Sequence, residues 1–170
     1  MTAMRKRRGG QATLEFVLAY SALLLPVTMM LVFTAKLLWV WNSMTDFTRE
    51  GVRYATTHCW QGDGENVRSW MRQNMPLTFD REQFVQGPAE IQVEYYARNV
   101  ESGSLEDFSC ELGECSVACV PDAVRVRITN YEFRQFFTYL GLPPLPMPDF
   151  QTSAPMESAG CNPDSTECLP

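Results

Sequence analysis

The feature that most constrains this chain is a long apolar run over residues 16–41, in which Lys36 is the only charged residue. As a helix, a run of this length would extend about 39 Å at ~1.5 Å per residue, whereas the hydrocarbon core of a bilayer is ~30 Å thick. The run therefore predicts a helix that crosses a membrane. Pro26 lacks a backbone N–H and predicts a local kink or loosening within that helix.

The residues that flank the run predict its orientation. The basic cluster before it consists of Arg5, Lys6, Arg7 and Arg8. Positive charge beside a span favours the cytoplasmic side, so we expect a cytoplasmic N-terminus and an exported remainder. Lys36, Trp39 and Trp41 lie toward the other end, where a lysine can reach the head groups and indole rings favour the interface with the lipid bilayer.

A cleaved secretory signal peptide is the nearest alternative. Such a peptide has an apolar region of ~7–15 residues followed by a small-x-small cleavage site. This run is longer, and Phe33-Thr34-Ala35 is a poor site because a bulky residue takes the first small position. We therefore favour a retained span.

The net charge excludes one class of partner. The chain has a formal net charge of −6, and without the four cations of the basic cluster the remainder would carry −10. Nucleic-acid binding draws most of its affinity from neutralised phosphates, so an acidic body argues against a nucleic-acid partner.

All of the cysteines follow the apolar run. They are Cys59, Cys110, Cys115, Cys119, Cys161 and Cys168. An even number on one side of a membrane predicts disulfides in an oxidising compartment, with the pairing left open. The alternatives are reduced core thiols, or a zinc site in which Cys110, Cys115 and Cys119 share a fourth ligand from the tail.

Hydrophobic periodicity predicts an α+β domain after the span. Apolar residues at alternating three- and four-residue steps extend the first helix to about residue 60, and a short second helix ends before Pro76. Residues 90–98 and 123–129 alternate as half-buried strands of an antiparallel sheet, and residues 150–156 are a weaker edge strand. Between the first two strands we expect a disulfide-bearing loop over residues 99–122. Residues 131–140 predict a helical turn, and the prolines after it an extended segment.

These observations predict five regions. They are a basic leader over residues 1–10, a transmembrane helix over 11–41, an amphipathic continuation over 42–62, an exported α+β domain over 63–158 and a cysteine-bearing tail over 159–170. No Ser-His-Asp set or glycine-rich phosphate loop is present, and His58 is the only histidine, so the sequence predicts no enzyme, resident metal or cofactor.

A basic leader that ends in glycine, followed at once by an apolar helix with an early glutamate, resembles the type IV pilin-like signal. Residues 7–16 read RRGGQATLEF, and residues 49–55 read REGVRYA. Together these two stretches resemble the TadE-like minor pseudopilins of tight-adherence (Tad/Flp) pilus systems. The sequence departs from that family in its long cysteine-bearing loop and tail. The alternative is an exported binding module, such as an adhesin or sensor, on a permanent anchor.

The resemblance implies a set of functional residues and partners. A prepilin peptidase would cut between Gly10 and Gln11, and Glu15, followed by Phe16, would pair with the N-terminal amine of an adjacent subunit. Other minor pseudopilins, the major pilin and the inner-membrane assembly platform would be the partners. The second stretch contributes the family-motif residues Arg49, Glu50, Gly51, Arg53 and Tyr54. From their helical spacing alone, the charged members Arg49, Glu50 and Arg53 are more often a solvated helix face with local ion pairs than a recognition patch.

Overall fold

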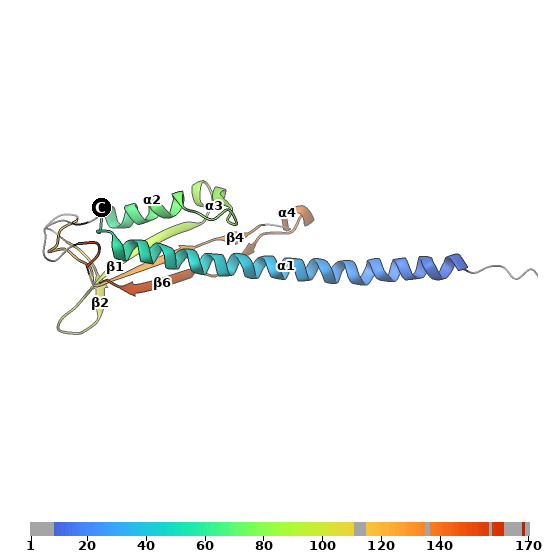
Figure 1. The fold of residues 1–170 in the computed structure, drawn as a ribbon, viewed down its shortest axis with the longest axis horizontal. Helices are drawn as coiled ribbons and strands as arrows, with labels where there is room; N and C mark the ends of the chain where they lie inside the picture. The colour runs from blue at the N-terminus through green and yellow to red at the C-terminus, as the bar shows by residue number, and fades with distance from the viewer. Residues whose placement is uncertain (1–8, 111–114, 135–136, 157, 162–167, 169–170) are drawn as a thin grey trace, which may run out of the picture. The chain divides into compact units, whose positions relative to one another are not determined.

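The structure is a computed structural model that describes residues 9–110, 115–134, 137–156, 158–161 and 168. The chain divides into two compact units, Met1–Trp39 and Val40–Pro170, which are described separately below. Helix α1 (Gly9–Thr57) begins in the first unit and ends in the second (Figure 1). The basic cluster Arg5, Lys6, Arg7 and Arg8 lies outside the described residues.

The first unit consists of the apolar part of α1. Its side chains are almost all exposed in the isolated chain, as expected for a surface that lipid would cover. The hydroxyls of Thr28 and Thr34 donate to the carbonyls of Leu25 and Met30, each at 2.9 Å, so these polar groups are satisfied within the helix. The helix continues through Pro26. Among the described residues, Ala12–Thr57 is the one helical stretch long and apolar enough to cross a membrane.

The second unit is built on a four-stranded antiparallel sheet. Its strands are β2 (Leu105–Asp107), β1 (Glu90–Arg98), β3 (Ala123–Thr129) and β6 (Phe150–Pro155), in that spatial order (Figure 1). The predicted strands over residues 90–98 and 123–129 are confirmed as the central pair, with Val93 opposite Val126. The predicted strand near residue 150 is confirmed as an edge strand, with Thr152 opposite Val126.

Strand alternation places one face of the sheet in the core. Ile91, Val93 and Tyr95 of β1 are buried, as are Val124, Val126 and Ile128 of β3. The α1 residues Met44 and Phe47 are also fully buried, and the hydroxyls of Thr48 and Thr152 lie 2.9 Å apart. The last four turns of α1 therefore cover the apolar face of the sheet, as the period of the sequence predicts.

The second predicted helix is α2 (Glu65–Gln73), which follows the short 3-10 helix η1 (Gly62–Gly64). Gly64 has a φ of +86°, and a Cβ on it would lie 2.7 Å from the side chain of Val93. A residue with a side chain would therefore be strained by its backbone and would also clash with the sheet. Val67 and Met71 are fully buried, so α2 contributes its apolar side to the same core as α1.

The three pairs of cysteines form disulfides, which resolves the alternatives of free thiols and a zinc site. Cys59 pairs with Cys115, Cys110 with Cys119, and Cys161 with Cys168. The first of these joins the end of α1 to the loop that precedes β3, across 56 residues. The long cysteine-bearing loop is thus tied to the helix that carries the apolar run.

Several short elements differ from the prediction. The first helix ends at Thr57 instead of about residue 60, and the predicted loop over residues 99–122 contains β2, which extends the sheet beside β1. Helix α3 (Arg81–Val85) was not predicted. The aromatic and proline-rich region forms a small hairpin of β4 (Glu132–Phe133) and β5 (Leu145–Pro146), with the predicted helical turn between them as α4 (Phe137–Leu140).

Candidate functional site

The first candidate site is the start of α1, where the sequence predicts processing and subunit pairing. Gly10 is exposed, and a side chain on it would meet nothing within 4 Å. Gln11 lies in the same helical turn, and Glu15 is exposed one turn further on. Phe16 is 69% exposed and its ring lies 6.2 Å from that of Tyr20. The described residues at this end therefore present an exposed Gly10 within the helix and an exposed apolar surface after it.

The residues predicted to mark the membrane interface are also exposed. Lys36 and Trp39 belong to the first unit, and Trp39 is 65% exposed. Trp41 belongs to the second unit, where it is 45% exposed and packs edge-on against Phe150 at 5.2 Å between ring centroids. Trp41 is therefore part of the packed domain as well as the end of the apolar run.

The second candidate site is the predicted family motif on α1, which the helix divides between two faces. Gly51 is buried, and a Cβ there would lie 2.6 Å from Sδ of the fully buried Met71. A glycine at this position therefore lets α1 and α2 approach closely. Arg49 and Glu50 are exposed instead, and Arg49 lies 3.4 Å from Asp46 in an exposed ion pair. That ion pair agrees with the interpretation of the charged residues as a solvated helix face.

Tyr54 is the centre of an aromatic stack that joins the two helices. Its ring lies 3.7 Å from that of His58 and 4.6 Å from that of Trp70, with interplanar angles of 19° and 13°. His58 is held further by its Nδ1, which lies 2.9 Å from the carbonyl of Tyr54 and 3.0 Å from the hydroxyl of Thr57. The only histidine is thus a packed part of α1's end.

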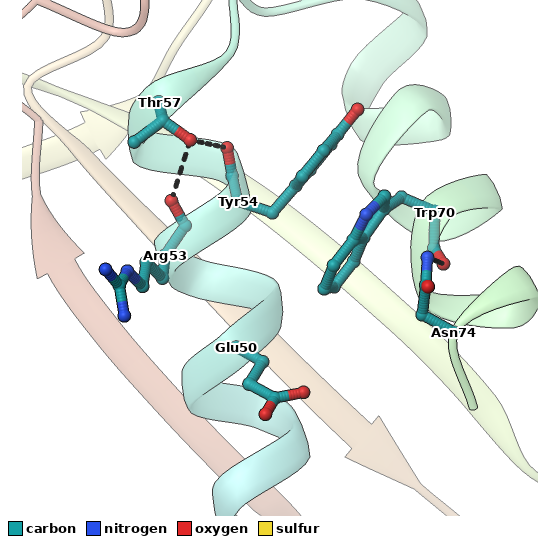
Figure 2. A pocket seen from close by; sticks show the side chains of 6 residues that line it. All are labelled: Glu50, Arg53, Tyr54, Thr57, Trp70 and Asn74. Atoms are coloured by element: carbon teal, nitrogen blue, oxygen red, sulfur yellow. Dashed lines mark hydrogen bonds between the residues drawn. The ribbon is translucent and has the colours of Figure 1, made fainter. Parts of the chain in front are cut away.

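An open pocket lies beside this stack (Figure 2). It is lined by Glu50, Arg53, Tyr54, Thr57, Trp70 and Asn74. The Thr57 hydroxyl donates to the carbonyls of Arg53 and Tyr54, at 3.2 and 3.0 Å, so it faces the helix backbone. The pocket combines an aromatic wall with one carboxylate and one guanidinium, which suits contact with a polar partner surface better than it suits bond chemistry.

Helix α2 carries a second group of charges. Arg68 and Arg72 lie 3.0 and 3.2 Å from the two carboxylate oxygens of Glu65. Slight burial raises the pKa of Glu65, but the hydrogen bond and charge of Arg68, with the charge of Arg72, outweigh it and lower the pKa overall. The exposed side of α2 is therefore a fixed network of paired charges.

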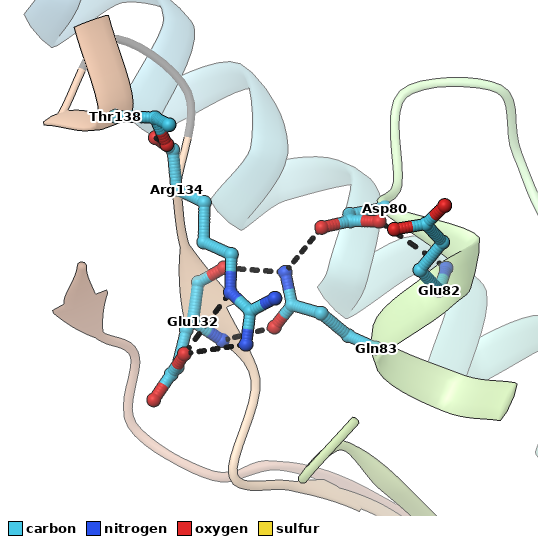
Figure 3. A network of polar contacts seen from close by, with 6 residues as sticks. All are labelled: Asp80, Glu82, Gln83, Glu132, Arg134 and Thr138. Atoms are coloured by element: carbon cyan, nitrogen blue, oxygen red, sulfur yellow. Dashed lines mark hydrogen bonds and ion pairs between the residues drawn. The ribbon is translucent and has the colours of Figure 1, made fainter. Parts of the chain in front are cut away.

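Sequence reasoning missed the polar network around Gln83, whose side chain is fully buried (Figure 3). Its amide nitrogen donates to Oδ2 of Asp80 at 3.0 Å and to the carbonyl of Glu132 at 2.8 Å, and its amide oxygen accepts from the N–H of Glu132 at 2.9 Å. Gln83 therefore pairs with β4 as a neighbouring strand would. The signal that could have predicted α3 is Asp80 followed by Gln83, the spacing of a helix-capping pair.

No protein family, curated protein or solved structure matches this chain.

Proposed function

We propose that the protein is a TadE-like minor pseudopilin that helps to assemble, prime or cap a tight-adherence type IV pilus. The observation that carries the proposal is the start of α1, where the exposed Gly10 is followed by Glu15 and a long exposed apolar surface. In this proposal a prepilin peptidase cuts after Gly10 on the cytoplasmic side. Glycine would give the peptidase unhindered access to the backbone.

The position of Glu15 supports a role in subunit pairing. After the cut, Gln11 would carry a free amine, and Glu15 would lie about one turn into the mature helix. A carboxylate near a helix N-terminus is favourable by ~0.3–1 kcal/mol, whereas one deep in lipid costs ~2.5–3.5 kcal/mol on insertion scales. Pairing with the N-terminal amine of an adjacent subunit would neutralise Glu15 and fix the register of the two helices.

The exported domain supports a role in packing and recognition. Its three disulfides suit an oxidising compartment outside the cytoplasm. The exposed motif residues Glu50 and Arg53 line the open pocket on α1 and would face other minor pseudopilins, the major pilin or the assembly platform. Such a protein would act through non-covalent contacts with its partners, and these contacts need no cofactor.

Processing is tested by mass analysis of the N-terminus of full-length protein expressed with a prepilin peptidase. We expect a polypeptide that starts at Gln11, and Gly10→Ile should retain the leader. Ala22→Ile is the matched control, since it adds the same side chain within the apolar run and leaves the cut untouched. Normal maturation of Gly10→Ile would refute the peptidase step.

Pairing is tested by Glu15→Gln. The variant should insert in the membrane and be cut as the wild type is, because neutralisation lowers the insertion cost and the cut is unchanged. Association with other pilin subunits should fail, and Glu15→Asp should be intermediate since its charge is kept but its reach is shorter. If Glu15→Gln co-purifies with pilin partners as well as the wild type does, Glu15 has no pairing role.

A second candidate is an exported binding module on a permanent anchor, which the open aromatic pocket favours. Tyr54 and Trp70 offer stacked rings to a ligand, beside the charges of Glu50 and Arg53. The N-terminal mass separates the two candidates, because a permanent anchor would retain the leader even when the peptidase is present.

A further inference from the structure

The hairpin between β4 and β6 has a composition unlike the rest of the exported domain. Residues 137–148 contain no charged residue and combine aromatic, leucine and proline side chains. Leu142 is 50% exposed and Leu145 is 37% exposed. Both belong to a segment whose backbone is ordered by hydrogen bonds, so their exposure follows from a defined fold.

Two backbone hydrogen bonds fix the path of the segment. The N–H of Met147 donates to the carbonyl of Tyr131, and the N–H of Leu142 donates to the carbonyl of Phe137, both at 2.9 Å. Gly141 has a φ of +66° at the turn that follows α4, and a Cβ added there would meet nothing within 4 Å. The turn is therefore open to its surroundings.

The charges that bracket this segment are already paired. Arg134 contacts one carboxylate oxygen of Glu132 through two nitrogens, at 3.0 and 3.1 Å, and Asp149 forms an ion pair with Arg127. Within residues 132–149, the charged side chains are therefore Glu132, Arg134 and Asp149 at the base, each in an ion pair, and residues 137–148 carry none. Paired charges are much less costly to bring near an apolar phase than isolated ones.

The register of the sheet shows at which end of the domain the hairpin lies. Phe150 begins β6 directly after the segment, and its ring packs on Trp41. Further along, Thr152 meets Thr48, and the backbone at Gly160 lies against the carbonyl of Thr57. Helix α1 therefore runs along β6 from the Phe150 end, and the hairpin lies at the end of the domain where the apolar run finishes.

Two other exposed apolar side chains occur in the segments that meet this end. Leu77 is 94% exposed in the loop after α2, and Val85 is 76% exposed at the end of α3. Phe79 in the same loop packs on Phe47, and Gln83 of α3 is bonded to β4 beside the hairpin. These contacts place both segments on the side of the domain that carries β4.

We propose that this end of the domain rests on the outer surface of the membrane, with Leu142 and Leu145 of the hairpin inserted among the lipid head groups. A bilayer is the occupant that the observations favour, because Trp41 ends the apolar run at the same end of the domain and the segment is free of charge. Aromatic and apolar side chains with few charges are typical of the membrane interface. The hairpin would then be a second membrane contact, which limits how the domain can tilt on its helix.

The proposal depends on one part of the proposed function, namely that α1 crosses the membrane, and it does not depend on pilus assembly. The test uses the full-length protein in nanodiscs of phosphatidylethanolamine and phosphatidylglycerol. A photo-crosslinking benzoylphenylalanine replaces Leu142 in one variant. The matched controls place it at Leu31, which is 65% exposed within the run, and at Val100, which is 98% exposed between β1 and β2 at the opposite end of the sheet.

We expect mass spectrometry to detect lipid adducts at positions 142 and 31 in several-fold higher yield than at position 100. Adducts at position 31 alone would overturn the hairpin contact and leave the anchor intact. Loss of adducts at position 31 would overturn the anchor itself, and with it the proposed function. Equal yields at 142 and 100, or adducts at 142 with a polypeptide, would also overturn the proposal. Leu142→Glu should lower the adduct yield of a probe at Leu145, whereas Val100→Glu should not.

Discussion

Gln83→Glu is the substitution that most directly tests how α3 holds the hairpin strand β4. The change replaces an amide NH₂ with an oxygen and leaves the size of the side chain unchanged. In the wild type that nitrogen donates to Asp80 at 3.0 Å and to the carbonyl of Glu132 at 2.8 Å. The ionised carboxylate of the variant could still accept from the N–H of Glu132, but it would lose both donated bonds and lie beside the carboxylate of Asp80.

The expected loss follows from those two bonds. A neutral hydrogen bond contributes ~1 kcal/mol and one to a charged group ~1.5–3 kcal/mol, so the variant should lose about 2.5–4 kcal/mol of unfolding free energy at neutral pH. Burial beside Asp80 would raise the pKa of the new carboxyl above its unfolded value of ~4.3. Below pH ~4.3 the protonated carboxyl can donate one of the two bonds, so the deficit is smaller there, and it grows as the pH rises through the raised folded pKa.

The assay is guanidinium unfolding of the full chain in detergent micelles, followed by near-ultraviolet circular dichroism at pH 5 and pH 8. Gln86→Glu is the matched control, because Gln86 is exposed at the end of the same helix and its replacement should change the unfolding free energy by less than ~0.5 kcal/mol. If Gln83→Glu also stays within ~0.5 kcal/mol of the wild type at pH 8, the buried amide does not hold β4.

Three further predictions concern stability. Gly51→Leu should destabilise the domain by at least the ~1–3 kcal/mol typical of overpacking, measured by the same unfolding assay, because a Cβ alone would already lie 2.6 Å from a buried methionine sulfur. Replacing both Cys59 and Cys115 by Ala should cost ~4 kcal/mol in the chain-entropy model, against ~2 kcal/mol for the C-terminal disulfide, since the cysteines are 56 and 7 residues apart. Burial raises the pKa of Tyr131. The stability that its neutral hydroxyl provides is therefore complete below pH ~10 and is lost as the pH rises through the pKa of the folded state. Tyr131→Phe should raise the pH at which the protein unfolds in alkali, as followed by circular dichroism.

The central strands could be predicted from the sequence because their pattern and their packing agree. Residues 90–98 and 123–129 alternate in polarity, and the alternate residues are the ones that meet α1 and α2 in the core. The long helix could be predicted for the same reason, since the apolar residues of its second half recur at the helical period and face the sheet. In these elements, local preference and tertiary burial require the same conformation.

The shorter elements could not be predicted because distant contacts determine them. Every residue of β2 is exposed, so no alternation marks it, and its conformation follows from pairing with the end of β1. Helix α3 has only five residues, and the buried Gln83 would be expected on a surface from its polarity alone. Its burial is explained by hydrogen bonds to a strand 49 residues away.

The motif on α1 could be located from the sequence, but the structure was needed to show which of its residues pack inside the domain and which are exposed. Gly51 and Tyr54 face α2, through Met71 and Trp70, so they determine how the two helices pack. Their roles in stability do not depend on any partner.

Arg53 is exposed on the same helix, lines the open pocket and is accessible to another protein chain. If the motif joins a structural half to a recognition half, Arg53→Ala should leave the unfolding free energy within ~0.5 kcal/mol of the wild type and still reduce co-purification with pilin partners. Gly51→Leu should lower both quantities, since the domain itself is affected. A variant at Arg53 that unfolds early, or one that keeps full partner association, would show that the two halves cannot be separated in this way.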